Sequence, residues 1–185
     1  TGATDGGITF KEGGTNFTDS LLVGTDSTGT LSSAEANTGV GTGVLAALTS
    51  GDNNTAVGFS SLLTNTTGSN NTAVGRCALK LTTTGIINTA MGTLTMCANT
   101  TGACNVAIGS NALRTNQTSS FNTAVGMNSL RTNTAQNNTA IGFSALCANT
   151  TAANNTAVGS CALTDNTSAA NNIAVGFCAL HKNTT

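Results

Sequence analysis

The chain has 185 residues, of which only 7% are charged and 3% aromatic, and it contains no Trp, Tyr or Pro. Its net charge of −1 leaves no basic excess to displace counterions, which argues against a nucleic-acid partner. With so few large side chains, we expect the chain to fill a thin interior rather than a thick globular core.

The first segment, residues 1–19, follows no regular pattern apart from Gly7, which is in phase with the repeat that follows. We predict that residues 1–19 form a cap or the end of a preceding module, and that residues 20–185 form one repeat domain. The sequence has no signal peptide and no apolar run of about twenty residues, so we predict no membrane insertion in this segment. Because it has no initiating Met and stops within a repeat, we interpret it as part of a longer protein.

From Gly24 onward one glycine returns every 17 residues, with a single step of 16 near Ala135. The phrase around it is Asn-Thr-Ala-Val-Gly, as at residues 54–58. We number each repeat from this glycine as position 0. A fixed short period predicts a solenoid, in which each turn buries its apolar side against its neighbours. The expected corner residues are Gly58, Gly75, Gly92, Gly109, Gly126, Gly142, Gly159 and Gly176.

Each repeat predicts two short strands, at positions −4 to −1 and +1 to +5, joined by a corner at the glycine and a longer turn at +7 to +12. Helices are disfavoured because Asn, Gly and β-branched residues recur throughout. The expected fold is an all-β parallel solenoid, a β-roll or β-helix, of about ten turns. With strands about 4.8 Å apart, the rod is on the order of 50 Å long.

In the eight repeats whose glycines run from Gly58 to Gly176, asparagine always occupies position −4. It also occupies +7 in all of them except the one that has Thr82. Stacked amides can donate to one another from turn to turn and also satisfy backbone groups in the turns. We therefore predict an asparagine ladder at −4, formed by Asn54, Asn71, Asn88, Asn105, Asn122, Asn138, Asn155 and Asn172.

Two stretches, Asn71–Leu79 and Asn155–Leu163, read Asn-Thr-Ala-Val-Gly-x-Cys-Ala-Leu. This phrase resembles the repeats of phage and large-virus tail fibres, and it is similar to the shorter repeats of trimeric autotransporter adhesin heads (YadA-like). The resemblance covers residues 37–185 and implies a left-handed β-roll, a trimeric or filamentous assembly and a place on a cell or virion surface.

Basic residues recur at position +5, where they share one face of the expected rod. Two of them, Arg114 and Arg131, lie on consecutive turns and must be solvated or meet acid from another chain. Such a stripe either binds an anionic glycan or keeps the surface soluble. No polar groups converge around the single histidine, so we predict no catalytic residue, metal ligand or cofactor. The stripe consists of Lys80, Arg114, Arg131 and His181.

Six cysteines occur without a Cys-x-x-Cys spacing, which makes a zinc site improbable. Cys161 and Cys178 both occupy +2 on adjacent turns, at a separation that suits a disulfide. Cys97 and Cys104 flank the longer turn of one repeat and could clip it. The alternatives are an interchain bond and a role as small apolar fillers; disulfides would indicate an extracellular setting.

Several Asn-x-Ser/Thr sequences lie on the longer turn and are candidate glycosylation sites if the host is eukaryotic. These candidates are Asn65, Asn99, Asn116, Asn149 and Asn166.

We therefore expect a structural, non-enzymatic segment of an extracellular or virion-surface filament, adhesin or tail fibre, associated with further copies of itself. One alternative is a module that binds a receptor or glycan through the +5 stripe. The other is an ice-binding solenoid, because threonine fills −3 in most repeats, with Val106 and Ile173 as interruptions.

Overall fold

The computed structural model describes residues 3–5, 8–14, 16–24 and 28–184, which form thirteen β-strands and no helix. The strands are β1 (Ala3–Asp5), β2 (Ile8–Gly14), β3 (Phe17–Val23), β4 (Ala34–Glu35), β5 (Thr38–Val40), β6 (Thr55–Val57), β7 (Thr72–Val74), β8 (Thr89–Met91), β9 (Val106–Ile108), β10 (Thr123–Val125), β11 (Thr139–Ile141), β12 (Thr156–Val158) and β13 (Ile173–Val175).

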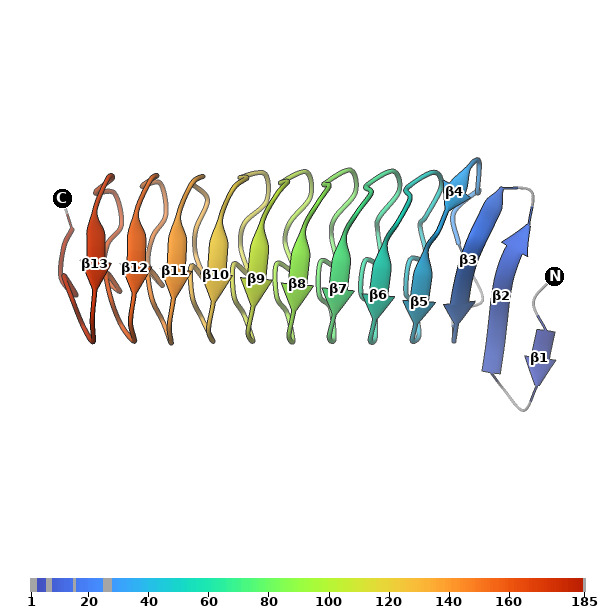
Figure 1. Ribbon diagram of the computed structural model, residues 1–185, viewed down its shortest axis with the longest axis horizontal. Helices are drawn as coiled ribbons and strands as arrows, with labels where there is room; N and C mark the ends of the chain where they lie inside the picture. Colours follow the sequence, from blue (N-terminus) through green and yellow to red (C-terminus); the bar gives the residue numbers. More distant parts are fainter. Residues whose placement is uncertain (1–2, 6–7, 15, 25–27, 185) are drawn as a thin grey trace.

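These strands form one sheet that runs the length of a straight rod (Figure 1). At its N-terminal end β1, β2 and β3 pair antiparallel, whereas from β3 to β13 the pairing is parallel, with the short β4 beside β3. Equivalent positions pair in register, so that Thr55 lies opposite Thr72 and Ala56 opposite Ala73. The predicted parallel β-solenoid is therefore confirmed, with nine turns between β5 and β13. The expected boundary at residues 19 and 20 falls inside β3. This strand pairs antiparallel with β2 and parallel with β5.

Each turn contains one three-residue strand, at −3 to −1, and the second strand that we predicted at +1 to +5 is absent from the described turns. The cause is the backbone: positions +2 and +4 have positive φ, for example 58° at Cys77 and 49° at Leu79. A left-handed residue turns the chain and ends the pleat of a strand. Hydrogen bonds still join successive turns here, as from the Cys77 N–H to the Phe59 carbonyl (2.9 Å).

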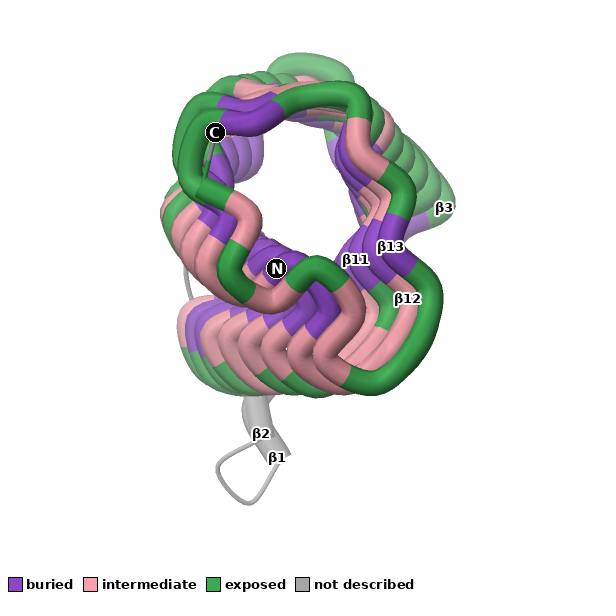
Figure 2. Tube along the Cα trace, turned by 90° about the vertical axis from the view of Figure 1, so that its left-hand side faces the viewer, coloured by how far each residue is buried: buried purple, intermediate pink, exposed green. Residues whose placement is uncertain are grey.

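The core is a file of small and medium side chains inside the rod. Alanine at −2 and leucine at +4 are buried in nearly every turn, as at Ala107 and Leu113, which have no exposed surface. The end-on view shows the buried residues on the inner side of the stacked turns (Figure 2). Since each turn buries so little apolar area, its stability depends on its neighbours, as expected for a solenoid.

The glycine at position 0 is required twice over. Its φ lies between 121° and 136° from Gly58 to Gly176, a region that L side chains rarely adopt. A Cβ at Gly109 would also lie 2.7 Å from the carbonyl of Gly126 in the next turn. The corner of the rod is therefore closed to any side chain.

Candidate functional site

The outer face of the sheet is lined by positions −3 and −1, because the −2 alanine between them points inward. Position −1 is Val, Ile or Met in every turn from β5 to β13, and Val57, Met91 and Ile108 expose 37%, 43% and 39% of their surface. We call these −1 residues together with the apolar residues at +1 the apolar ridge. The −1 residues are Val40, Val57, Val74, Met91, Ile108, Val125, Ile141, Val158 and Val175.

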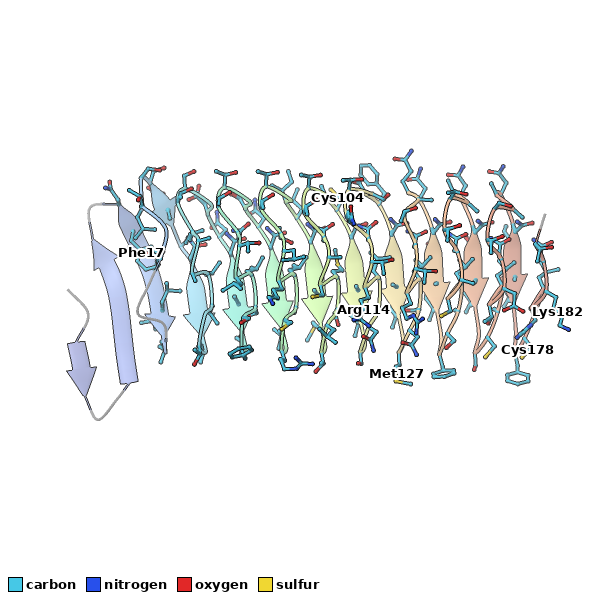
Figure 3. The ribbon with its side chains drawn as sticks, turned by 180° about the vertical axis from the view of Figure 1, so that it is seen from behind. Phe17, Cys104, Arg114, Met127, Cys178 and Lys182 are labelled. Atoms are coloured by element: carbon cyan, nitrogen blue, oxygen red, sulfur yellow. The ribbon has the colours of Figure 1, made fainter. Side chains whose placement is uncertain are left out.

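The ridge widens across the glycine corner, where some turns place a large apolar side chain at +1. These side chains are Phe59, Met127, Phe143 and Phe177, and all four are exposed. Figure 3 shows Met127 at one edge of the rod, pointing away from the turn. The three phenylalanines, each exposed by about half or more, lie on separate turns, and the −1 residues run continuously past them. A contiguous exposed apolar surface of this kind indicates an interaction site.

Threonine hydroxyls on the longer turn form hydrogen bonds with the next turn, whereas, among the described residues, those on the outer face of the sheet do not. At +8 they donate to the next turn, as from Thr49 Oγ1 to the Thr66 carbonyl (2.9 Å) and from Thr66 Oγ1 to the Thr83 carbonyl (3.1 Å). At −3 the hydroxyls of Thr55, Thr72, Thr89, Thr123, Thr139 and Thr156 make no hydrogen bond within the described part of the chain. The sheet face therefore offers free hydroxyls beside the ridge, although Val106 and Ile173 interrupt their file.

The basic residues at +5 lie on another face of the rod, and Arg114 projects from the side opposite the sheet (Figure 3). Arg114 and Arg131 are both exposed, as expected for like charges on consecutive turns. Among the described residues the one ion pair joins His181 Nδ1 to Asp165 Oδ2 (3.5 Å). Lys80 and the two arginines consequently have no acidic partner within those residues.

The asparagine ladder at −4 runs through the interior. Asn71 Nδ2 donates to Asn54 Oδ1 (3.2 Å) and to the Gly85 carbonyl (2.9 Å), while the Asn71 backbone N–H also donates to Asn54 Oδ1 (3.0 Å). Asn54, Asn88 and Asn105 repeat this set, and the backbone N–H donates to the preceding asparagine Oδ1 at every ladder position from Asn54 to Asn172. The one-residue deletion changes it locally, because Asn138 Nδ2 there donates to Asn133 Oδ1 (3.2 Å) instead. The ladder is structural, since its members are buried or nearly so and point away from every outer face.

The five candidate glycosylation sites require a correction. Their side chains have no exposed surface, and each amide nitrogen donates to the carbonyl three residues later, as Asn65 Nδ2 does to Gly68 (2.9 Å). The nitrogen that would carry a glycan is therefore engaged inside the folded rod. The residues concerned are Asn65, Asn99, Asn116, Asn149 and Asn166.

All six cysteines are free thiols. Burial raises the pKa of Cys97, as does nearby Cys77 on the preceding turn, and the charges of Lys80 and Arg114 oppose this rise only in part. Cys104, which we had paired with Cys97, lies near the edge of the rod opposite Met127 (Figure 3). The Cys97–Cys104 disulfide stays a prediction. The thiol that influences the pKa of Cys97 is Cys77, not Cys104.

Two apolar features were missed in the sequence. One is the +1 part of the ridge, which occurs in only some turns. The other is a set of exposed apolar residues at the longer turn, Ile86 and Ile87 on one turn and Phe121 two turns later. A comparison of each turn with its neighbours would have found both, because large apolar residues there replace Ser, Ala and Asn.

In the part of the chain that the structure describes, no three His, Cys, Asp or Glu residues gather in a way that would hold a metal ion. Nor do these residues contain a helix long and apolar enough to cross a membrane. No protein-family model matches the chain, and neither does any curated protein or solved structure. The functional assignment therefore rests on the fold and on the surfaces described above.

Proposed function

We propose that this chain is a structural, non-catalytic segment of a fibre on a cell or virion surface, and that copies of it associate side by side along the apolar ridge. The observation that carries this proposal is the ridge itself. It continues through every turn from β5 to β13, and six of its nine −1 residues are exposed while Val74, Val125 and Val158 are half-buried. A rod that keeps such a stripe in water gains by burying it.

A second copy of the chain suits the ridge better than an unrelated globular partner. The ridge repeats once per turn, about every 4.8 Å, so a partner that matches it along its whole length needs the same rise. Another rod of the same sequence has that rise. The −3 and −1 positions carry no charge in any turn, so two such faces can meet without burying an unpaired ion.

Sedimentation equilibrium tests this proposal. We expect the chain to associate at micromolar concentration, and Ile108→Lys, at the centre of the ridge, to shift it toward a monomer of 18.2 kDa. Ile87→Lys is the matched control, because Ile87 is also an exposed isoleucine but lies off the ridge. A parent chain that stays monomeric, or an equal effect of both substitutions, would contradict the proposal.

The second candidate function is binding of an anionic glycan along the +5 stripe. It is favoured by Arg114 and Arg131, which are exposed without an acidic partner in the described chain. Replacing both with Ser should abolish retention on a sulfated polysaccharide, whereas Arg76→Ser, at the exposed +1 position, should not. Equal retention of the parent and the double variant would assign the stripe a solubilising role only.

The ice-binding alternative is favoured by one observation, the unpartnered hydroxyls at −3. The larger −1 side chains beside them and the interruptions at Val106 and Ile173 count against a regular hydroxyl array. Measurable thermal hysteresis at micromolar protein, lost in Thr123→Lys but kept in Thr83→Lys, would favour it over self-association. No hysteresis would eliminate it.

A further inference from the structure

Cys161 and Cys178 occupy the same position, +2, in successive turns. The Cys161 N–H donates to the Phe143 carbonyl and the Cys178 N–H to the Ser160 carbonyl, each at 2.9 Å. Their φ angles, 58° and 52°, are also alike. Because backbone and register match, both side chains leave the chain in the same direction, one turn apart. A turn spacing of about 4.8 Å is within the Cα separation that disulfides adopt.

The Cys161 thiol also influences the ionisation of Cys178. Burial raises the pKa of the Cys178 thiol, and the nearby Cys161 raises it further. Both residues are only half-buried, so a small molecule can reach them. Figure 3 shows Cys178 near the outer edge of its turn.

Another thiol, Cys147, is an alternative partner for Cys161. It occupies +5 on the turn before Cys161, and its pKa is raised by burial, with a smaller contribution from Cys161. Cys147 occupies +5 and Cys161 occupies +2, so their side chains do not leave the chain at equivalent positions. Cys77 and Cys97 also occupy +2 and +5 on adjacent turns, but in the opposite order, with the +2 residue on the earlier turn. Cys161 and Cys178 are therefore the one pair on adjacent turns that share a column.

We propose that Cys161 and Cys178 are a redox-dependent staple, which joins two successive turns when the chain meets a small oxidised thiol such as glutathione disulfide. One thiolate attacks the glutathione disulfide, forms a mixed disulfide and releases one glutathione thiolate. The second thiol, after losing its proton to solvent, attacks the protein sulfur and releases the second. The protein pair is oxidised by two electrons, and one glutathione disulfide is reduced to two glutathiones.

The staple has a physical consequence that does not depend on the proposed fibre role. Turns of a solenoid contact only their neighbours, so a rod can open one turn at a time. A bond between the turns of β12 and β13 makes them open together. Oxidation should therefore slow proteolysis in residues 162–177, which the staple encloses.

Mass spectrometry can identify the bond directly. The chain is equilibrated with glutathione disulfide, and free thiols are then blocked with N-ethylmaleimide. Trypsin and Asp-N together cut after Arg131, before Asp165 and after Lys182, which separates residues 132–164 from 165–182. Cys147 and Cys161 are on the first fragment and Cys178 on the second, so a Cys161–Cys178 bond joins the fragments and a Cys147–Cys161 bond does not.

We expect joined fragments in the parent chain, in Cys147→Ser and in the control Cys104→Ser, and separate fragments in Cys161→Ser. Loss of the join in Cys147→Ser would assign the bond to Cys147 and overturn the proposal. Separate fragments in the parent chain, or glutathione left on Cys161 or Cys178, would overturn it as well. All these outcomes can be read whether or not the chain self-associates, so they are independent of the fibre proposal.

Discussion

Thr82 occupies the +7 position one turn after Asn65, and the Asn65 Oδ1 atom is buried without a hydrogen-bond partner. In most turns where asparagine follows asparagine at +7, the later amide donates to the earlier one, as from Asn116 Nδ2 to Asn99 Oδ1 (3.1 Å). Asn133 is the exception, because its Nδ2 donates to the Ala135 carbonyl and leaves Asn116 Oδ1 without a partner. Thr82 has no amide to donate. Its hydroxyl accepts from Asn99 Nδ2 (3.4 Å), so this file of +7 side chains breaks between Thr82 and Asn65. A buried acceptor without a partner costs roughly 1–3 kcal/mol.

We therefore expect Thr82→Asn to raise the free energy of unfolding by about 1 kcal/mol, because the new amide can donate to Asn65 Oδ1. Urea unfolding followed by circular dichroism measures this change. Thr84→Asn, at an exposed position of the same turn, is the control and should leave stability nearly unchanged. A Thr82→Asn chain that is less stable than the parent would contradict the ladder account.

The corner glycines offer a matched pair of substitutions. A Cβ at Gly109 would meet the Gly126 carbonyl at 2.7 Å, whereas a Cβ at Gly176 would meet nothing within 4 Å, although both residues have positive φ. Gly176→Ala should cost about 1 kcal/mol from backbone strain alone. Gly109→Ala adds the clash between turns and should cost several kcal/mol or prevent folding. Thermal unfolding compares the two, and equal losses would mean that φ, not the close approach, selects glycine.

Ile87 adopts φ 58° at +12, where five other turns have asparagine. A β-branched residue is strained in this left-handed region, whereas asparagine tolerates it. Because Ile87 is 52% exposed, its replacement forfeits little buried area. Ile87→Asn should therefore stabilise the chain by about 1 kcal/mol in urea unfolding. The matched change Ile86→Asn, at a neighbour without positive φ, should not, and a gain in both would point to surface polarity instead.

Stability should also depend on pH at the alkaline side. Burial raises the pKa of Cys97 and of Cys147 in the folded chain. A thiol whose pKa is raised by folding stabilises the fold below its unfolded pKa, about 8.5, and that contribution disappears as pH rises through the folded value. The urea midpoint should therefore fall as pH rises above about 8.5, and the fall should shrink when Cys97 and Cys147 are both replaced by Ser. An unchanged slope in that variant would contradict this assignment.

Much of the fold could be predicted from the sequence, because equivalent positions of successive solenoid repeats share the same environment and so carry similar residues. Ala at −2 and Leu at +4 recur in step with the glycine, and both are buried as that phase implies. The second strand could not be excluded in this way. Leucine, serine and cysteine at +2 and +4 carry no signal for positive φ, and the asparagines that tolerate it occupy +2 in only two turns, at Asn111 and Asn128.

The surfaces were less predictable for a related reason. An asparagine at +7 reads as a glycosylation site on a loop, yet Asn99 is buried and donates to the Gly102 carbonyl (3.1 Å). Its orientation depends on the closure of the turn, which the local sequence does not encode. The ridge was only partly visible, since Phe59 and Phe143 lie on it with Thr, Arg or Ser at the same position in other turns.

Electron cryo-microscopy of the purified chain shows directly whether the rods associate through the ridge. We expect rods lying side by side with their apolar ridges in contact and with a repeat of about 4.8 Å along the axis. Well-separated single rods, at concentrations where the ridge would be buried by association, would contradict it.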